Sequence, residues 1–205
     1  MVNFSNMNFL GHLYLSNDDL PLMTANLFGD YVKGKNYTHL PEIVQKGVRL
    51  HRKIDSFTDQ HPSLKKVKQV LYPELPKITP VAIDLYLDHL LAKHWNSFHA
   101  LPLHEFTERF LAYFFSTQRD QFNEPTTFIY PAEFIHLITM MKRYNWLNRY
   151  AQLEGLDMAC TKLSQRIAFP NVLHKGKTVF LAHEELITDA FWEFMQDAQT
   201  ISCCD

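Results

Sequence analysis

Cysteines and long apolar runs are scarce in this sequence, and each absence narrows the kind of protein it can be. The 205 residues include three cysteines, of which Cys203 and Cys204 are adjacent. We therefore expect no disulfide framework, as is usual in the reducing cytoplasm. No run of about 18 uncharged apolar residues occurs, so no membrane-spanning helix is predicted. The first residues carry neither a basic start nor a cleavage site of small residues, so we expect no signal peptide. Together these absences predict a cytoplasmic protein without a membrane partner.

Strict alternation of apolar and polar residues is almost absent too, which argues against β-strands. Apolar residues recur instead at spacings of three and four, as in Ile83, Leu87 and Leu90, and prolines stand where helices would begin, as at Pro41 and Pro62. The composition, 46% hydrophobic and 20% charged, is that of a globular protein. We predict an all-α fold, a single-domain helical bundle over residues 1–205. The expected helices cover residues 6–16, 21–34, 41–58, 62–72, 80–98, 102–118, 131–153, 155–167 and 177–199, and residues 119–130 are expected to form a long loop.

The charges are unevenly distributed along the chain. The net charge is −2, yet the segment from Lys33 to Lys68 holds nine Lys or Arg residues against three acids, a local balance of +6. Such a local excess favours an anionic partner or substrate over duplex DNA. A merely solvated cationic face would give the same pattern. The sequence does not predict the oligomeric state.

The stretch RLHRKIDSFTDQHP, residues 49–62, concentrates polar residues at helical spacing. His51, Asp55 and Asp59 recur every four residues. On a helix they would share one face, because successive residues turn by about 100°. A histidine and an aspartate four residues apart can bind one cation, although single pairs of this kind also occur on solvated surfaces. This stretch is therefore one candidate wall of a metal site.

Other acids and histidines stand in apolar surroundings. Asp84, Asp88 and His89 interrupt the apolar run PVAIDLYLDHLL, Asp30 lies in NLFGDYVKG, and His12 lies in NFLGHLYL. Buried carboxylates are costly unless they are paired or bound to a cation. Two interpretations stay open: these groups pair with basic side chains or cap neighbouring helices, or they form a divalent metal site inside the bundle. Because no cysteine belongs to the set, Mn²⁺, Fe²⁺ or Mg²⁺ would be favoured over structural zinc.

Four segments, taken in order, resemble the signature segments of one known family: NFLGHLYLS, ANLFGDYVKG, GVRLHRKIDSFTDQHP and ITPVAIDLYLDHLLAKHW. That family is acyl carrier protein phosphodiesterase, and weaker similarity continues through NWLNRYAQLEGLDMACTKLSQRI. The resemblance implies an atypical HD-type phosphohydrolase with an all-helical, HD-domain-like fold and a divalent metal, most commonly Mn²⁺. The implied reaction removes the 4′-phosphopantetheine arm from holo-acyl carrier protein.

Carried onto this sequence, the resemblance implies a set of site residues. An ordinary HD domain has His then Asp, whereas the adjacent pair here runs Asp88-His89, which puts a direct transfer of ligand roles in doubt. The expected metal ligands are His51, Asp55, Asp88 and His89, followed by Asp30. Asp59 or His12 would accept a proton or orient a ligand, and Arg52 would neutralise phosphoryl oxygens. Acyl carrier proteins are strongly acidic, so the cations expected to attract one are Lys33, Lys46, Arg49, Lys65, Lys66 and Lys68.

Two other functions fit the same residues. One is an HD-like metal phosphohydrolase that acts on a nucleotide or another small phosphate ester. The other is a non-catalytic helical binding module in which the acids and histidines form a structural polar network. Metal content after chelation, and a panel of small phosphoesters tested beside the holo-carrier, would separate the three.

Overall fold

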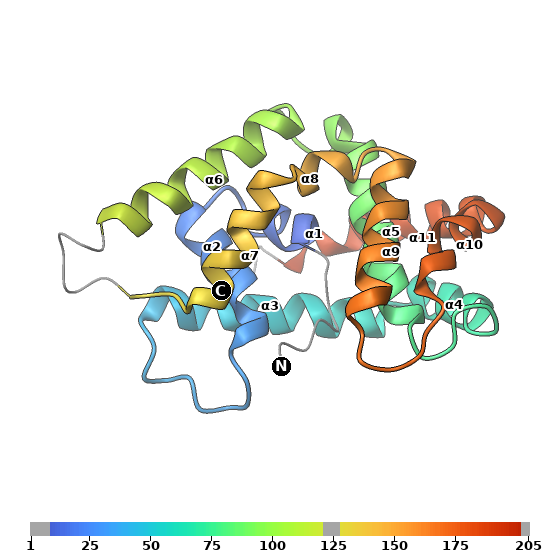
Figure 1. Ribbon diagram of the computed structural model, residues 1–205, viewed down its shortest axis with the longest axis horizontal. Coiled ribbons are helices and arrows are strands. Elements are labelled where there is room, and N and C mark those ends of the chain that lie inside the picture. Colours follow the sequence, from blue (N-terminus) through green and yellow to red (C-terminus); the bar gives the residue numbers. More distant parts are fainter. Residues whose placement is uncertain (1–8, 121–127, 202–205) are drawn as a thin grey trace.

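A computed structural model describes residues 9–120 and 128–201 of the chain, and within these ranges every regular element is helical (Figure 1). The all-α prediction is therefore confirmed. No helix in the described ranges is long and apolar enough to cross a membrane. The α-helices are α1 (Phe9–Tyr14), α2 (Leu20–Phe28), α3 (Glu42–Gln60), α4 (Pro62–Leu71), α5 (Thr79–Lys93), α6 (Leu103–Asp120), α7 (Ala132–Arg143), α8 (Trp146–Arg149), α9 (Leu153–Arg166), α10 (Gly176–Ala182) and α11 (Glu184–Ala198). Three 3₁₀ turns join them: η1 (Gly29–Tyr31), η2 (Trp95–Ser97) and η3 (Leu173–Lys175).

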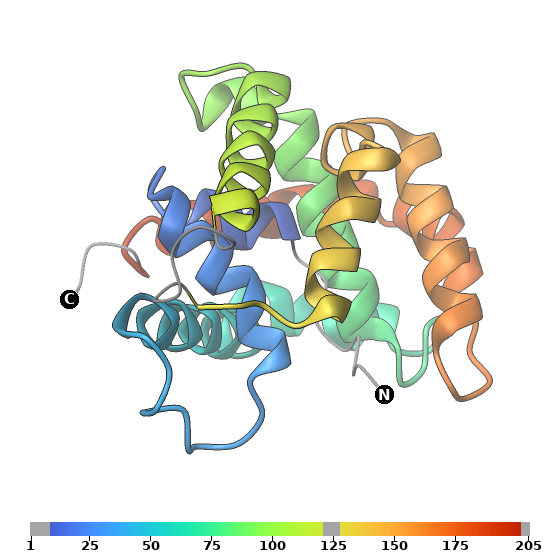
Figure 2. The same ribbon diagram turned by 60° about the vertical axis from the view of Figure 1, so that its left-hand side comes forward.

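Helix α5 forms the centre of the molecule. All but two of its 15 residues are buried, as expected of a helix that is apolar on every side. Helices α1, α4, α9 and α11 pack against it, and both views show it running through the middle of the bundle (Figure 1, Figure 2). The polar residues Asp84, Asp88 and His89 are therefore carried into the interior.

The pairing of α2 with α3 is the closest helix contact near the candidate site. Helix α3 buries Val44, Val48, His51 and Ile54 at three- and four-residue spacing, which gives it one buried face. Gly47 lies on the same face, and a Cβ there would clash with the backbone of Ala25 in α2. The glycine thus lets the two backbones approach, and the approach brings α3 up to α1 and α2.

Two predicted helices are divided in the structure. The stretch 177–199 contains α10 and α11, which meet at His183, where φ is −126° and ψ is 21°. The stretch 131–153 contains α7 and α8, and Asn145 between them has a left-handed φ of 52°. Asparagine tolerates that conformation better than most residues, whereas nothing in the residue type of His183 marks a break.

Other boundaries differ by less than two turns. The predicted helices 21–34 and 80–98 end in the 3₁₀ turns η1 and η2. Of the predicted loop 119–130, residues 119 and 120 belong to α6, and residues 128–130 are non-helical. The remainder of that loop, residues 6–8 of the first predicted helix, and Cys203 and Cys204 lie outside the described residues.

Candidate metal centre

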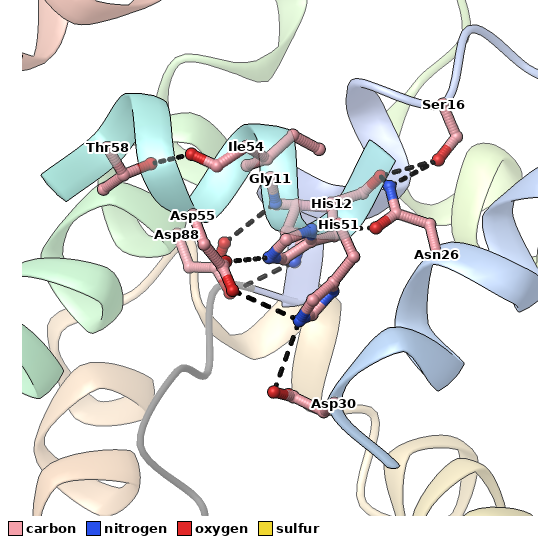
Figure 3. A network of polar contacts seen from close by, with 11 residues as sticks. Gly11, His12, Ser16, Asn26, Asp30, His51, Ile54, Asp55, Thr58 and Asp88 are labelled. Atoms are coloured by element: carbon pink, nitrogen blue, oxygen red, sulfur yellow. Dashed lines mark hydrogen bonds and ion pairs between the residues drawn. The ribbon is translucent and has the colours of Figure 1, made fainter. Parts of the chain in front are cut away.

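Two imidazoles and one carboxylate converge where α1 meets α3. His12 comes from α1, and His51 and Asp55 come from successive turns of α3. Their ligand atoms all lie within 4.8 Å of one another. The Asp55 carboxylate faces the Nε2 atoms of both rings, with Oδ1 3.3 Å from His12 Nε2 and Oδ2 3.4 Å from His51 Nε2 (Figure 3). This donor set, two neutral nitrogens and one anionic oxygen, is typical of a divalent transition-metal site.

Asn26 determines where His12 carries its proton. The Asn26 side-chain nitrogen donates to the backbone oxygen of His12 at 2.9 Å and to Ser16 Oγ at 3.0 Å, so Oδ1 is left to accept from His12 Nδ1 at 3.0 Å. A neutral His12 with its proton on Nδ1 presents the Nε2 lone pair to Asp55. These electron-rich atoms repel each other unless a proton or a cation lies between them. Burial and the neighbouring His51 lower the pKa of His12, so a cation suits this position better than a proton.

His51 stands between two carboxylates. Its Nε2 lies 3.3 Å from Asp30 Oδ1, and its ring stacks on that of His12 with the centroids 4.2 Å apart (Figure 3). Burial opposes a positive charge on His51, but Asp30 and Asp55 outweigh it and raise the pKa of the imidazole. The close fit depends on Gly29, because a Cβ there would overlap the His51 ring. Asp30 and Asp55 thus approach the same nitrogen of His51, and Asp30 lies beside the candidate metal ligands.

A cavity of about 30 Å³ opens beside the triad, between α3, α4 and α5. His12 and Asp55 belong to its wall. The other polar residues of the wall are Thr58, Asp59, Lys65, Lys68 and Asp84. Three carboxylates and two ammonium groups therefore face a space next to the candidate metal ligands.

Asp84 is the carboxylate of this wall that the expected site residues left out. Its side chain is 7% exposed and has no hydrogen-bond or ion-pair partner within the part of the chain that the structure describes. Burial, together with the charges of Asp55 and other carboxylates, raises its pKa well above the ordinary value. A buried, unpartnered acid beside a cavity is costly unless a ligand or ion meets it. The sequence signal was its position in an apolar helix four residues before Asp88.

Asp88 and His89, expected as ligands, have other partners. The two oxygens of Asp88 accept hydrogen bonds from the backbone N–H groups of Gly11 at 2.9 Å and Leu10 at 3.1 Å, so the side chain caps the start of α1 (Figure 3). Burial raises the pKa of Asp88 to about 8, and these N–H groups oppose the rise. His89 Nδ1 donates to the backbone oxygen of Tyr150 at 2.6 Å. Adjacent residues of a helix point about 100° apart, so both cannot face α3. Of the expected ligands, His51 and Asp55 lie in the triad with His12, and Asp30 lies beside His51.

Comparison with known proteins gives the family of this chain. Residues 7–198 match the family described as acyl carrier protein phosphodiesterase. The chain belongs to this family. Relatives named acyl carrier protein phosphodiesterase from Salmonella dublin, Salmonella newport and Salmonella heidelberg are each 27% identical to it over 189 residues, 92% of this chain and 93% of theirs. No solved structure matches the chain.

The acyl carrier protein phosphodiesterase family consists of hydrolases that remove the phosphopantetheine from holo-acyl carrier protein, as the sequence resemblance implied. Arg52, expected at the phosphoryl group, lies elsewhere in this member of the family. Its Nη2 donates to the backbone oxygens of Val32 at 3.0 Å and Gly34 at 2.6 Å, and its guanidinium stacks on Tyr37. Arg52 therefore holds the loop after η1 and does not belong to the cavity wall.

The cations expected to attract the carrier protein fall into two groups in this acyl carrier protein phosphodiesterase. Lys65 and Lys68 belong to the cavity wall, whereas Lys66 on the same helix does not. The other expected cations, Lys33, Lys46 and Arg49, are exposed, and Lys46 pairs with Glu42 at 3.2 Å. Asp59 is exposed on α3 at the edge of the cavity.

Proposed function

We propose that this chain removes 4′-phosphopantetheine from holo-acyl carrier protein with the help of a divalent metal ion held by His12, His51 and Asp55. The observation that carries the metal dependence is the His12 Nε2 lone pair, fixed by Asn26 and aimed at the Asp55 carboxylate 3.3 Å away. Family membership supports the substrate. A donor set without thiolate argues against structural zinc, and we propose Mn²⁺, the metal that the resemblance implies, with Fe²⁺ or Mg²⁺ as alternatives.

A metal ion in this position would supply Lewis acidity toward a phosphoryl oxygen and toward water. The chain's own residues would do the rest. Asn26 would hold the His12 ring through Nδ1. Asp30 would stand beside the ion, because it contacts the same His51 nitrogen that faces Asp55. Asp59, one turn beyond Asp55 and exposed at the cavity edge, would accept the proton that the attacking water loses. Asp84 would complete the anionic wall around the ion.

The reaction balances without a further reactant. An O–P bond forms from water, and the bond between phosphorus and the carrier's serine oxygen breaks. The leaving serine oxygen takes up a proton, which gives the apo-carrier and free 4′-phosphopantetheine. Asp59 would lose to solvent the proton that it accepted, so the site returns to its starting state.

The decisive measurement is the intact mass of holo-acyl carrier protein after incubation with this protein, with Mn²⁺ and with chelator. We expect the mass of the arm to disappear only when metal is present, and to persist when Asp55→Ala replaces the native protein. Persistence of the arm with folded, metal-loaded protein would contradict the proposal. A panel of small phosphate esters in the same assay tests the alternative substrate class.

We also propose a cytoplasmic location and a purely protein partner. The described thiol, Cys160, is free and buried, as is usual in a reducing compartment. The basic segment 33–68 would meet the acidic surface of the carrier, and we propose no nucleic-acid role for it.

A further inference from the structure

Two lysines, Lys65 and Lys68, belong to the wall of the cavity. Lys65 and Lys68 lie three residues apart on α4, so their side chains share one face of the helix. Lys65 is exposed and Lys68 is partly buried. Neither has an ion pair with a carboxylate in residues 9–120 or 128–201. A partly buried ammonium group without a partner favours an anion from solution.

The same cavity contains unpaired acids. Asp59 and Asp84 also line it, and neither pairs with a lysine of α4 among the described residues. The cavity is thus divided, with imidazoles and carboxylates on the walls from α1, α3 and α5 and ammonium groups on the wall from α4. A ligand that satisfies both sides must be an anion next to the lysines and must also approach the metal ligands. A phosphate group would have this character with a metal ion held by His12, His51 and Asp55, because some of its oxygens could face that cation and others the lysines.

No other cation of the basic segment takes this position in the described structure. Arg52 donates to backbone oxygens of the loop after η1, and Lys53 Nζ donates to the backbone oxygen of Ile201 at 2.9 Å. Lys66 lies next to Lys65 in sequence but outside the wall. The chain therefore offers two cations to a phosphate in the cavity, and a neighbouring lysine that serves as a control.

We propose that Lys65 and Lys68 form a phosphate-binding wall, which recognises the phosphodiester of the substrate and binds a phosphomonoester more tightly. The identity of the phosphodiester rests on the proposed function. A phosphodiester carries one negative charge, whereas a phosphomonoester carries about 1.5 to 2 at neutral pH. The released 4′-phosphopantetheine is such a monoester, so the wall makes the product an inhibitor and makes inorganic phosphate a competitor of the substrate.

The test measures inorganic phosphate binding to the metal-loaded protein by isothermal titration calorimetry, with no carrier protein present. We expect Lys65→Ala/Lys68→Ala to weaken phosphate binding by about tenfold or more, the usual effect of losing charge-assisted hydrogen bonds. The matched control, Lys33→Ala/Lys66→Ala, removes two charges from the same basic segment outside the wall and should change the affinity by about twofold at most. Lys65→Arg/Lys68→Arg should restore part of the binding. The affinity for 4′-phosphopantetheine should rank these variants in the same order as the affinity for inorganic phosphate.

Equal phosphate affinity in the wall variant and the native protein would overturn the inference, and so would an equal loss in the control variant. Mn²⁺ affinity and thermal unfolding of each variant show whether the fold is intact, and Lys65→Gln/Lys68→Gln replaces the alanine pair if that pair unfolds. Because binding is measured without turnover, the two proposals fail separately. Wall-dependent phosphate binding without loss of the carrier's arm would refute the proposed substrate and keep the anion site, whereas turnover with wall-independent binding would do the reverse.

Discussion

His12 and His51 are stacked histidines whose pKa values shift in opposite directions. His12 is lowered by burial and by its neighbour, whereas two carboxylates raise His51 despite its burial. Without metal, a proton on His51 and none on His12 is the arrangement that the surroundings favour. A divalent ion at Asp55 would displace that proton, so metal binding and proton release are coupled at this site.

The coupling predicts how stability depends on pH. His51, Asp84 and Asp88 have raised pKa values, so the metal-free folded protein keeps protons that the unfolded chain releases. Stability should therefore fall as the pH rises from about 6.5 to 8.5, by up to about 1.4 kcal/mol per pH unit for each retained proton. His12 and His89 have lowered pKa values, so near pH 6.5 the unfolded chain protonates them more than the folded protein does. They offset the fall in stability by only about 0.4 kcal/mol each, because both are nearly neutral in either state at higher pH.

Thermal unfolding in chelator and in Mn²⁺, at pH 6.5 and 8.5, measures this effect. The midpoint should fall with pH in chelator, and the increment that Mn²⁺ adds should grow, because the ligands bind the ion only when deprotonated. Asp30→Asn should reduce the pH slope in chelator. A metal-free midpoint that rises over this range would contradict the assigned proton positions.

Substitution of Asp88 shows whether this residue caps α1 or binds the metal ion. Asp88→Ala removes the acceptors of two buried N–H groups at the start of α1 and should cost about 2–4 kcal/mol of unfolding free energy. Asp55→Ala should instead lower Mn²⁺ affinity by about 100-fold or more. Calorimetric Mn²⁺ titration of both variants at a temperature where both are folded decides between them. If Asp88→Ala lost Mn²⁺ affinity as completely as Asp55→Ala, Asp88 would return to the ligand set.

The sequence identified most of the site's residues but not their partners. Periodicity placed His51 and Asp55 on one helix face, and the apolar context of His12 and Asp84 marked them as unusual. The sequence alone could not give the rotation of α5 about its own axis, which determines which of its side chains face α1 and α3. That rotation sends Asp88 to the α1 backbone and His89 to Tyr150, and it follows from packing between segments distant in the sequence.

At the scale of elements, η1 packs closely against α3 because Gly29 has no side chain. Gly29 has ordinary helical angles, φ −49° and ψ −37°, so alanine is compatible with its backbone. The added Cβ would nevertheless overlap the His51 ring. A substitution at Gly29 therefore tests whether the contact between η1 and α3 determines the position of the His51 ring.

Gly29→Ala should displace His51 and lower Mn²⁺ affinity by about 10- to 100-fold, the usual effect of disturbing a ligand's support. Gly34→Ala is the control, because a Cβ there meets no atom within 4 Å, although its φ of +74° makes alanine strained. It should cost some stability and leave Mn²⁺ affinity unchanged. Titration of both proteins with Mn²⁺, beside thermal unfolding, gives the comparison, and equal affinities would show that His51 tolerates the shift.

The helices themselves were largely predictable, since long periodic segments such as α3 and α5 have proline at or just before their first turn and a continuous pattern. The points at which a predicted helix is divided were harder to predict. His183 divides α10 from α11 with no glycine or proline nearby, and its Nε2 lies 2.6 Å from Glu74 Oε1. A helix end fixed by such a tertiary contact leaves little local trace in the sequence.

For the whole molecule, the separation of charge is the feature that concerns the partner. The segment 33–68 carries +6 in a chain with a net charge of −2, and it supplies α3 and α4, two of the helices that line the cavity. Cations in this segment but outside the cavity wall, such as Lys33 and Arg49, are exposed. They can act on an acidic carrier at a distance, whereas Lys65 and Lys68 act on the phosphate itself.

This difference in position predicts that the exposed cations affect KM in a way that depends on salt concentration. Lys33→Glu/Arg49→Glu should raise KM for holo-acyl carrier protein by about tenfold at low ionic strength, with kcat unchanged, because the charges steer association. The effect should nearly vanish near 1 M salt, where the Debye length is about 3 Å. Lys162→Glu/Lys175→Glu reverses two exposed charges on α9 and η3 and should change KM little. Steady-state kinetics at several salt concentrations provide the measurement, and a salt-independent rise in KM would mean that Lys33 or Arg49 contacts the carrier directly.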